Sequence, residues 1–260
     1  MNDVLYSVDN AVATVVVNRP EAMNSLTVRA KTALLEALTA AARTPSVRAV
    51  LLTGSGRAFC AGQDLAEHAV NLEAGRGLNE TVRAHYNPII RMITEMDKPV
   101  VAAVNGVAAG AGASLAFACD LRIASERARF AMAFSGIALA PDSGASWTLQ
   151  RLVGAARAAE LLLLGEPLGA DRALELGIVS RVVPADELDT EARALAVRLA
   201  QGPTSAYAAT KRALRFAATG SLAEALELEA DLQDACVETN DHLNATRAFL
   251  AKERPVFEGH

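Results

Sequence analysis

The first part of the chain alternates between short runs of β-branched residues and a longer segment with helical spacing. Residues 4–9 and 12–20 are rich in Val and flank Asn10-Ala11, which predicts a β-hairpin. Residues 27–44 carry apolar side chains three and four positions apart, which predicts an amphipathic helix with Thr27 as its N-cap. Its buried face is expected to contain Ala30, Leu34, Leu35, Leu38 and Ala41.

The same alternation of strand and helix continues to about residue 140. Buried strands are expected at 48–56 and 98–109 and shorter ones at 121–126 and 128–132, with helices over 81–96 and from 110. Residues 56–65 are expected to form a loop and the polar residues 65–80 a surface excursion, while residues 65–90 are expected to shape the pocket. From about residue 145 the pattern is mostly helical, with turns at Gly154, Gly165, 176–184 and Gly202. This order predicts an α/β core closed by a helical region.

Composition and charge exclude several classes of function. Hydrophobic residues make up 52% of the 260 residues and charged residues 21%, which is typical of a globular chain with a sizeable core. The net charge of −5 and the lack of a Lys/Arg block give no sign of nucleic-acid binding. The N-terminus lacks the features of a signal peptide, and the apolar runs are too short to cross a membrane. Three widely spaced cysteines predict neither a disulfide framework nor a metal site, so we expect a cytoplasmic protein.

Two glycine-rich loops raise the question of ligand binding. Neither 54–59 nor 110–115 completes the G-x-G-x-x-G fingerprint, and no Lys-Ser/Thr pair follows, so nucleotide binding is not supported. Both loops join a strand to a helix through small residues, so their backbone N–H groups could bind an oxyanion. The loops in question are Cys60-Ala61-Gly62 and Gly110-Ala111-Gly112. The alternative is that both are ordinary tight turns.

One carboxylate stands in an unusual position. Asp142 follows the apolar run 137–140 and Pro141, and it precedes the small residues 143–146. A carboxylate among apolar atoms is costly unless it is paired or protonated. Asp142 could therefore be a catalytic group, or it could cap a helix that begins near Ser143.

The motifs of the chain resemble those of one family along nearly its whole length. They are "NRPEAMNSL" (18–26), "RAFCAGQDL" (57–65), "KPVVAAVNGVAAGAGASLAFACDLRIAS" (98–125), "PDSGASWTLQRLVG" (141–154), "ELGIVSRVVP" (175–184) and "RAFLAKERPVF" (247–257). In this order they resemble the enoyl-CoA hydratase/isomerase (crotonase) superfamily. The stretches around 62–65 and 136–147 are most similar to the epoxyphenylacetyl-CoA isomerases.

The resemblance implies an α/β fold of the crotonase type, a spiral of ββα units with a C-terminal helical trimerisation region. Residues 1–200 would form the core and 201–260 the helical region, in a homotrimer or hexamer. The substrate would be an acyl-CoA thioester, with no metal and no separate cofactor. By position, the N–H groups of Ala61 and Ala111 would bind the thioester oxygen. The remaining substrate-binding residues would be Ala22, Gly62, Gln63, Asp64, Leu65, Gly110 and Phe134, with Phe249 and Lys252 from a neighbouring subunit.

The departures from the family pattern bear on the reaction. Hydratases of the family use two Glu residues, whose positions are occupied here by Ser114 and Phe134. Asp142 stands where those hydratases have Gly, as in some isomerases of the family. One carboxylate suffices for a 1,3-proton shift, so we expect an enoyl-CoA isomerase with Asp142 as the proton shuttle. The alternatives are a hydratase, an inactive acyl-CoA-binding protein, and a dehalogenase with Asp142 as nucleophile. The position of the histidine base in such a dehalogenase matches Asn87, with His85 just before it.

Overall fold

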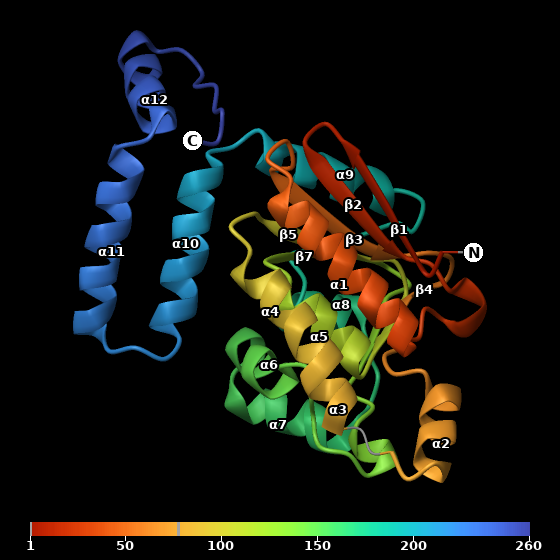
Figure 1. The fold of residues 1–260 in the computed structure, drawn as a ribbon. Helices are drawn as coiled ribbons and strands as arrows, with labels where there is room; N and C mark the ends of the chain where they lie inside the picture. Colours follow the sequence, from red (N-terminus) through yellow and green to blue (C-terminus); the bar gives the residue numbers. More distant parts are fainter. Residues whose placement is uncertain (1, 77–78) are drawn as a thin grey trace.

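In the computed structural model, which describes residues 2–76 and 79–260, the strands form two sheets (Figure 1). The larger sheet has the order β1-β2-β3-β5-β7-β10, and the smaller sheet has the order β4-β6-β8-β9. The larger sheet contains β1 (Val4–Asp9), β2 (Val12–Val17), β3 (Ala49–Gly54), β5 (Val100–Val104), β7 (Leu121–Ser125) and β10 (Arg181–Val183). The smaller sheet contains β4 (Ala58–Cys60), β6 (Val107–Ala109), β8 (Arg129–Ala131) and β9 (Leu168–Gly169).

From β3 to β8, consecutive strands enter different sheets. β3, β5 and β7 lie in the larger sheet, and the strand that follows each of them, β4, β6 or β8, lies in the smaller one. The pairs β3–β5, β5–β7, β4–β6 and β6–β8 are all parallel, so each unit of two strands and a helix advances both sheets by one strand. The result is a spiral of ββα units, whose repeat is structural and has no fixed period in the sequence.

Helices cover both faces of the larger sheet. Val50 and Leu52 of β3 belong to the main core beneath α1 (Val28–Arg43), while Ala49 and Leu51 pack in a second cluster with α9 (Leu188–Ala200). This alternation is the period of two that a strand buried on both faces requires. The other helices of this part are α2 (Leu65–Glu73), α3 (Asn79–Thr81), α4 (Asn87–Glu95), α5 (Ala111–Ala118), α6 (Ala145–Val153), α7 (Ala155–Leu164) and α8 (Ala170–Glu175), with short turns η1 (Pro20–Ala22), η2 (Val82–Tyr86) and η3 (Ser135–Ile137).

Several predicted elements are confirmed. β1 and β2 form an antiparallel hairpin whose turn residues Asn10 and Ala11 both have positive φ. The Thr27 hydroxyl accepts a hydrogen bond from the N–H of Ala30 and so caps α1. The helix expected over 81–96 is present, and η2 forms a π-helical turn within it that places the backbone N–H of Asn87 on the carbonyl of Val82.

Two expectations were wrong, and the expected surface excursion at 65–80, whose described residues are mostly exposed, contains a helix that was not predicted. The predicted loop 56–65 contains β4, which is held by its pairing with β6. The predicted turn 176–184 contains β10, which pairs with β7. The predicted surface excursion contains α2, whose N-cap is Asp64; residues 77 and 78 of that segment lie outside the described residues. In each case the stabilising partner is distant in sequence or is a side-chain cap that composition does not reveal.

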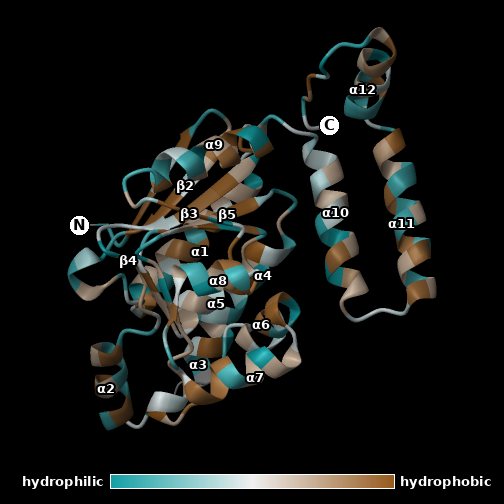
Figure 2. Cartoon of the chain, turned by 180° about the vertical axis from the view of Figure 1, so that it is seen from behind, coloured by the Kyte–Doolittle hydropathy of each residue, from teal (hydrophilic) through white to brown (hydrophobic). Residues whose placement is uncertain are grey.

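The last three helices form an arm beside the layered part of the chain (Figure 1). They are α10 (Thr204–Ala217), α11 (Leu222–Val237) and α12 (Asn240–Ala251), and each carries exposed large apolar side chains. Figure 2 shows apolar residues recurring along all three helices. Lys211 ties the arm to the core by donating to Asp120 Oδ2 at 2.7 Å. Within residues 2–76 and 79–260, no helix combines the length and apolar character that a membrane crossing requires.

Candidate active site

The two glycine-rich loops meet at the end of the smaller sheet. A Cβ atom on Gly62, which has φ +86°, would lie 3.2 Å from the backbone nitrogen of Ala111. A Cβ atom on Gly112 would lie 2.0 Å from the carbonyl oxygen of Cys60. Only glycine permits this approach, so Gly62 and Gly112 are both required for the end of β4 to lie against the start of α5.

The hydrogen bonds of the first loop change which N–H group can bind a ligand. The N–H of Ala61, the expected donor, already donates to the carbonyl of Met23 at 3.0 Å. Leu26 pairs with Gln63 as in a parallel sheet, donating to Gly62 O and accepting from Asp64 N. In such a bridge the N–H of the central residue points away from its partner, and the N–H of Gln63 has no backbone acceptor among the described residues. The available donor is therefore Gln63 rather than Ala61.

The second loop presents the start of α5. Gly110, with φ +50°, precedes the helix, and Ser114 makes the first intrahelical bond, to the carbonyl of Gly110. The N–H of Ala111 at the first helical position has no backbone acceptor in the described part of the chain. Ala111 itself is helical, so its Cβ causes no strain, and the N-terminal end of the helix dipole favours negative charge at this point.

Asp142 does not cap a helix. α6 begins at Ala145, its N-cap is Gly144, and no side chain caps it. The Asp142 carboxylate instead accepts a hydrogen bond from the Ser143 hydroxyl at 2.8 Å. Its main-chain carbonyl accepts from the Ala145 N–H at 3.0 Å. The alternative that Asp142 is a helix cap is therefore wrong.

Ser114 links the Asp142 loop to the second glycine-rich loop. The Ser114 hydroxyl lies 3.2 Å from the carbonyl of Gly110 and 3.4 Å from that of Asp142. The buried ring of Phe134 approaches the same loop, since its Cε1 atom lies 4.0 Å from where a Cβ on Gly110 would be. Ser114 and Phe134, which replace the two expected glutamates, thus lie beside Gly110.

Burial raises the pKa of the Asp142 carboxyl above its ordinary value. The hydrogen bond from Ser143 and the positive charge of Lys31 act in the opposite direction without cancelling the effect of burial. A carboxylate whose pKa is raised by desolvation is suited to take up a proton and release it again.

Lys31 and its partners were missed by the sequence analysis. Lys31 is 1% exposed, and its ammonium donates to Gln63 Oε1 at 3.0 Å and to the Thr81 hydroxyl. The Tyr86 hydroxyl donates to the same Gln63 oxygen at 2.9 Å. A signal was present, because Lys31 lies three residues before Leu34 and therefore on the apolar face of α1.

The other predicted substrate-binding residues are less directly placed. The Asp64 carboxylate is occupied by the Arg19 guanidinium at 2.8 Å and by the Ser25 hydroxyl, and it also caps α2. Ala22 ends η1 next to this group, and Leu65 opens α2 with an exposed side chain. These contacts make Asp64 a support of the loop, while the roles of Ala22 and Leu65 in substrate binding stay predictions.

Two predicted residues lie on the arm. Phe249 is 81% exposed on α12, and Lys252 is the left-handed C-cap of that helix. In Figure 1, α12 lies at the far end of the arm from α5 and α6.

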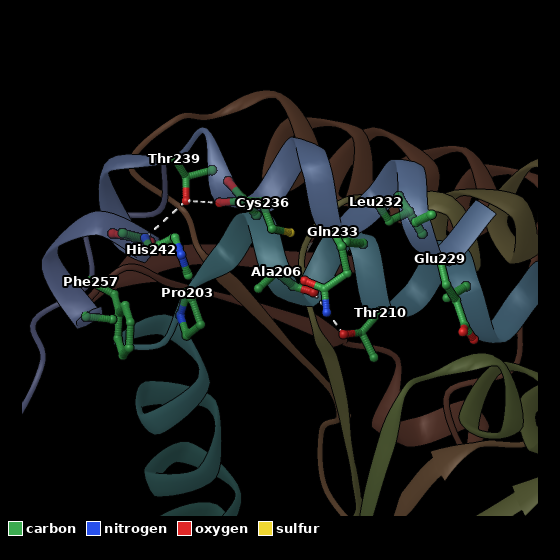
Figure 3. A pocket seen from close by; sticks show the side chains of 16 residues that line it. Pro203, Ala206, Thr210, Glu229, Leu232, Gln233, Cys236, Thr239, His242 and Phe257 are labelled. Atoms are coloured by element: carbon green, nitrogen blue, oxygen red, sulfur yellow. Dashed lines mark hydrogen bonds between the residues drawn. The ribbon is translucent and has the colours of Figure 1, made fainter. Parts of the chain in front are cut away.

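A cavity of about 550 Å³ also lies in the arm, between α10, α11 and α12, with Thr210, Gln233 and Phe257 in its wall (Figure 3). It is separate from the group around Asp142.

Comparison with known proteins identifies the class. The family model described as "Enoyl-CoA hydratase/isomerase" matches residues 7–260, so the chain belongs to the enoyl-CoA hydratase/isomerase family. It is an acyl-CoA-processing enzyme of that superfamily and has the crotonase fold.

Three individual proteins illustrate the similarity. The chain is 42% identical over 260 residues to the 1,2-epoxyphenylacetyl-CoA isomerase of Escherichia coli, covering 100% of this chain and 99% of the relative. It is 41% identical over 254 residues to a Rhodobacter capsulatus protein named "Probable enoyl-CoA hydratase", covering 98% and 97%. A solved structure from Mycobacterium abscessus, titled "putative Enoyl-CoA hydratase/isomerase", superposes with a TM-score of 0.95 at 46% identity, covering 99% of this chain and 100% of that one.

Proposed function

We propose that the protein is an enoyl-CoA isomerase that moves a double bond by a proton shift, with Asp142 as base and then acid. The observation that carries this proposal is the Asp142 carboxylate itself. It is half-buried, takes no part in helix capping, and is tied through its carbonyl to Ser114 at the start of α5. Ser114 and Phe134 stand where the family's hydratases carry glutamates, and neither side chain can exchange a proton as a carboxylate does.

The reaction would proceed in two proton transfers. The Asp142 carboxylate removes a proton from C2 of a 3-enoyl thioester, and the electron pair of that C–H bond delocalises onto the thioester oxygen. The N–H groups of Gln63 and Ala111 hold the resulting negative charge. The Asp142 carboxyl then returns the proton to C4, the double bond forms between C2 and C3, and the carboxylate is restored. The sum of atoms and charges is unchanged, as an isomerisation requires.

A paired assay tests the proposal. Purified protein is given a 3-enoyl-CoA and a 2-enoyl-CoA separately, and the products are separated by chromatography. Conversion of the 3-enoyl to the 2-enoyl ester with little 3-hydroxyacyl-CoA supports an isomerase. Asp142→Asn should lower kcat by about 10³-fold, within the usual range for a lost acid–base group, while acyl-CoA binding persists. Asp97→Asn, which changes an exposed carboxylate on the surface, is the control.

Hydration is the second candidate, because the Rhodobacter relative is named as a hydratase. The same assay distinguishes it when run in H₂¹⁸O. Rapid formation of 3-hydroxyacyl-CoA carrying one ¹⁸O atom would replace the isomerase proposal with hydration by an unusual acid.

We also propose that the chain assembles as a homotrimer or a hexamer. The arm exposes Leu214, Leu222 and Leu250, each at 70% or more, which a partner copy would cover. Phe249 and Lys252 of a neighbouring subunit would then reach the CoA moiety near Ala22 and Gly62. Light scattering gives the mass directly, and a monomer at micromolar concentration would contradict this arrangement.

A further inference from the structure

The buried ammonium of Lys31 has a complete set of acceptors. It donates to Gln63 Oε1 and to the Thr81 hydroxyl, and it lies 4.8 Å from the centroid of the Tyr86 ring. A lysine ammonium has three N–H donors and no acceptor, and these three partners are two oxygens and a π face. Thr81 in turn lies 3.1 Å from His85 Nδ1, so its hydroxyl can accept from Lys31 and donate to the ring. The partners therefore match a charged lysine rather than a neutral one.

The same contacts fix Gln63. Lys31 from α1 and the Tyr86 hydroxyl from the π turn η2 both donate to Gln63 Oε1, and Gln63 Nε2 donates to the carbonyl of Asp64 at 3.3 Å. The amide orientation follows from this network, because an NH₂ group in place of Oε1 would face two donors. Gln63 is thus held from two helical segments at the residue whose backbone N–H is available for the thioester oxygen.

Lys31 also acts on Asp142 through charge. Its positive charge lowers the pKa of the Asp142 carboxyl against the larger effect of burial, and burial lowers the pKa of Lys31 itself. The other charged or titratable groups that face Lys31 come from the first glycine-rich loop, α2 and η2. They are Asp64, Glu67, His85 and Tyr86.

We propose that Lys31 is a positioning residue that fixes the oxyanion donor at Gln63 by its direct contact with that side chain, and whose positive charge also acts on Asp142. The inference rests on the proposed isomerase function, because it gives Gln63 and Asp142 their roles. Lys31 is too buried to contact substrate, so it acts through these two residues. Lys31 would thereby couple the Asp142 carboxylate, which removes the proton, to the N–H group of Gln63, which binds the negatively charged thioester oxygen.

The test compares Lys31→Met and Lys31→Arg with the wild-type protein. Lys31→Met should lower kcat for the 3-enoyl-CoA roughly ten- to a hundredfold, the scale of a misplaced catalytic group, with a smaller change in KM. The acid limb of the pH–rate profile should move to higher pH, because Asp142 loses a positive charge that lowers its pKa and must still be deprotonated to act as base. Lys31→Arg keeps the charge and should return the acid limb towards its wild-type position.

Lys98→Met is the matched control. Lys98 is also buried, and its ammonium caps the opposite end of α1 by donating to the carbonyls of Ala41 and Thr44, both at 2.7 Å. This variant should lower Tm but leave the acid limb in place. A Lys31→Met protein that only loses Tm, with wild-type kcat and pH profile, would overturn the proposal.

A second measurement separates this inference from the proposed function. Binding of a cinnamoyl-type CoA thioester shifts its ultraviolet band to the red when donors polarise the carbonyl, and the shift needs no turnover. If the wild-type protein fails to isomerise a 3-enoyl-CoA, the proposed function fails, while the band shift still reports on Lys31. We expect a smaller shift in Lys31→Met, and in Lys31→Gln should the Met variant not fold. An unchanged shift with either variant contradicts the positioning role.

Discussion

The hydroxyl of Ser114 lies 3.4 Å from the main-chain carbonyl of Asp142, and this contact joins the first turn of α5 to the loop that carries the carboxylate. A residue that occupies a hydratase glutamate position here holds the proposed base in place. The same hydroxyl also lies 3.2 Å from the carbonyl of Gly110, so one side chain links the Asp142 loop to the second glycine-rich loop.

Ser114→Ala should therefore lower kcat by more than its loss of stability can explain. The single Ser114 hydroxyl proton is shared between the two carbonyls, and a hydrogen bond of this kind contributes about 1 kcal/mol to the free energy of unfolding. We expect a similarly small loss of stability and a several-fold fall in kcat, measured by thermal melts and isomerase assays. Ser125→Ala is the control, because Ser125 is equally buried and accepts from the backbone of Arg127, away from the site. Equal kcat in both variants would show that Ser114 is only a packing residue.

The pH dependence of activity should reflect the environment of Asp142. Since burial raises its pKa, kcat/KM should fall on acidification through a value above the ordinary pKa of an aspartate, about 3.9. Ser143→Ala removes the hydrogen bond that opposes this effect, so the acid limb should move to higher pH. A limb that stays in place in Ser143→Ala would mean that another group controls it.

The same shift predicts a stability effect with a defined sign. The folded protein binds the Asp142 proton more tightly than the unfolded chain does, so this group's contribution falls as pH rises from the unfolded pKa through the folded pKa. Denaturant titrations at several pH values should show this pH-dependent contribution to the free energy of unfolding, and the contribution should be absent in Asp142→Asn. The variant would then be relatively more stable than the wild type above the folded pKa.

Gly112→Ala should separate the two loops of the site. Its Cβ would lie 2.0 Å from the carbonyl oxygen of Cys60, and backbone must move to relieve that contact. We expect a loss of about 1–3 kcal/mol in the free energy of unfolding, together with loss of the band shift on thioester binding. Gly136→Ala is the control, because a Cβ there has no heavy atom within 4 Å and Gly136 does not have positive φ. Wild-type polarisation in Gly112→Ala would contradict the loop contact as the basis of the oxyanion site.

Lys211→Met should loosen the arm. Its ammonium donates to Asp120 Oδ2 and to the carbonyls of Ile93 and Lys98, which anchor α10 to the core. Removing charged hydrogen bonds of this kind costs roughly 1.5–3 kcal/mol each at most, and Asp120 would lose its ionic partner. We expect a lower Tm and weaker assembly by light scattering. Arg212→Met, whose pairing with Asp97 is exposed, should change neither.

The sequence analysis predicted elements that local signals define. The hairpin turn at Asn10 and the Thr27 cap are such signals, and both are confirmed. β4 and β10 were missed, because each has only three residues and depends on a parallel neighbour far along the chain. Local propensity carries no information about such a partner.

The site was predicted in part for the same reason. Glycine spacing located the two loops, and the isolated carboxylate located Asp142. Which N–H remained available depended on the pairing of Leu26 with Gln63, which is a tertiary contact. Lys31 illustrates the opposite case, since its place on the apolar face of α1 was visible in the sequence.

The alternation of strands between two sheets places β4 and β6 side by side. Gln63 lies three residues after the end of β4, and Ala111 lies two residues after the end of β6. Parallel neighbours in a sheet are about 4.8 Å apart, which suits two donors that converge on one oxygen atom. The sheet therefore sets the distance between the two N–H groups that the proposed reaction uses. Side chains in the later loops can change the choice of acyl group while the distance between the two donors stays set by the hydrogen bonds of the sheet.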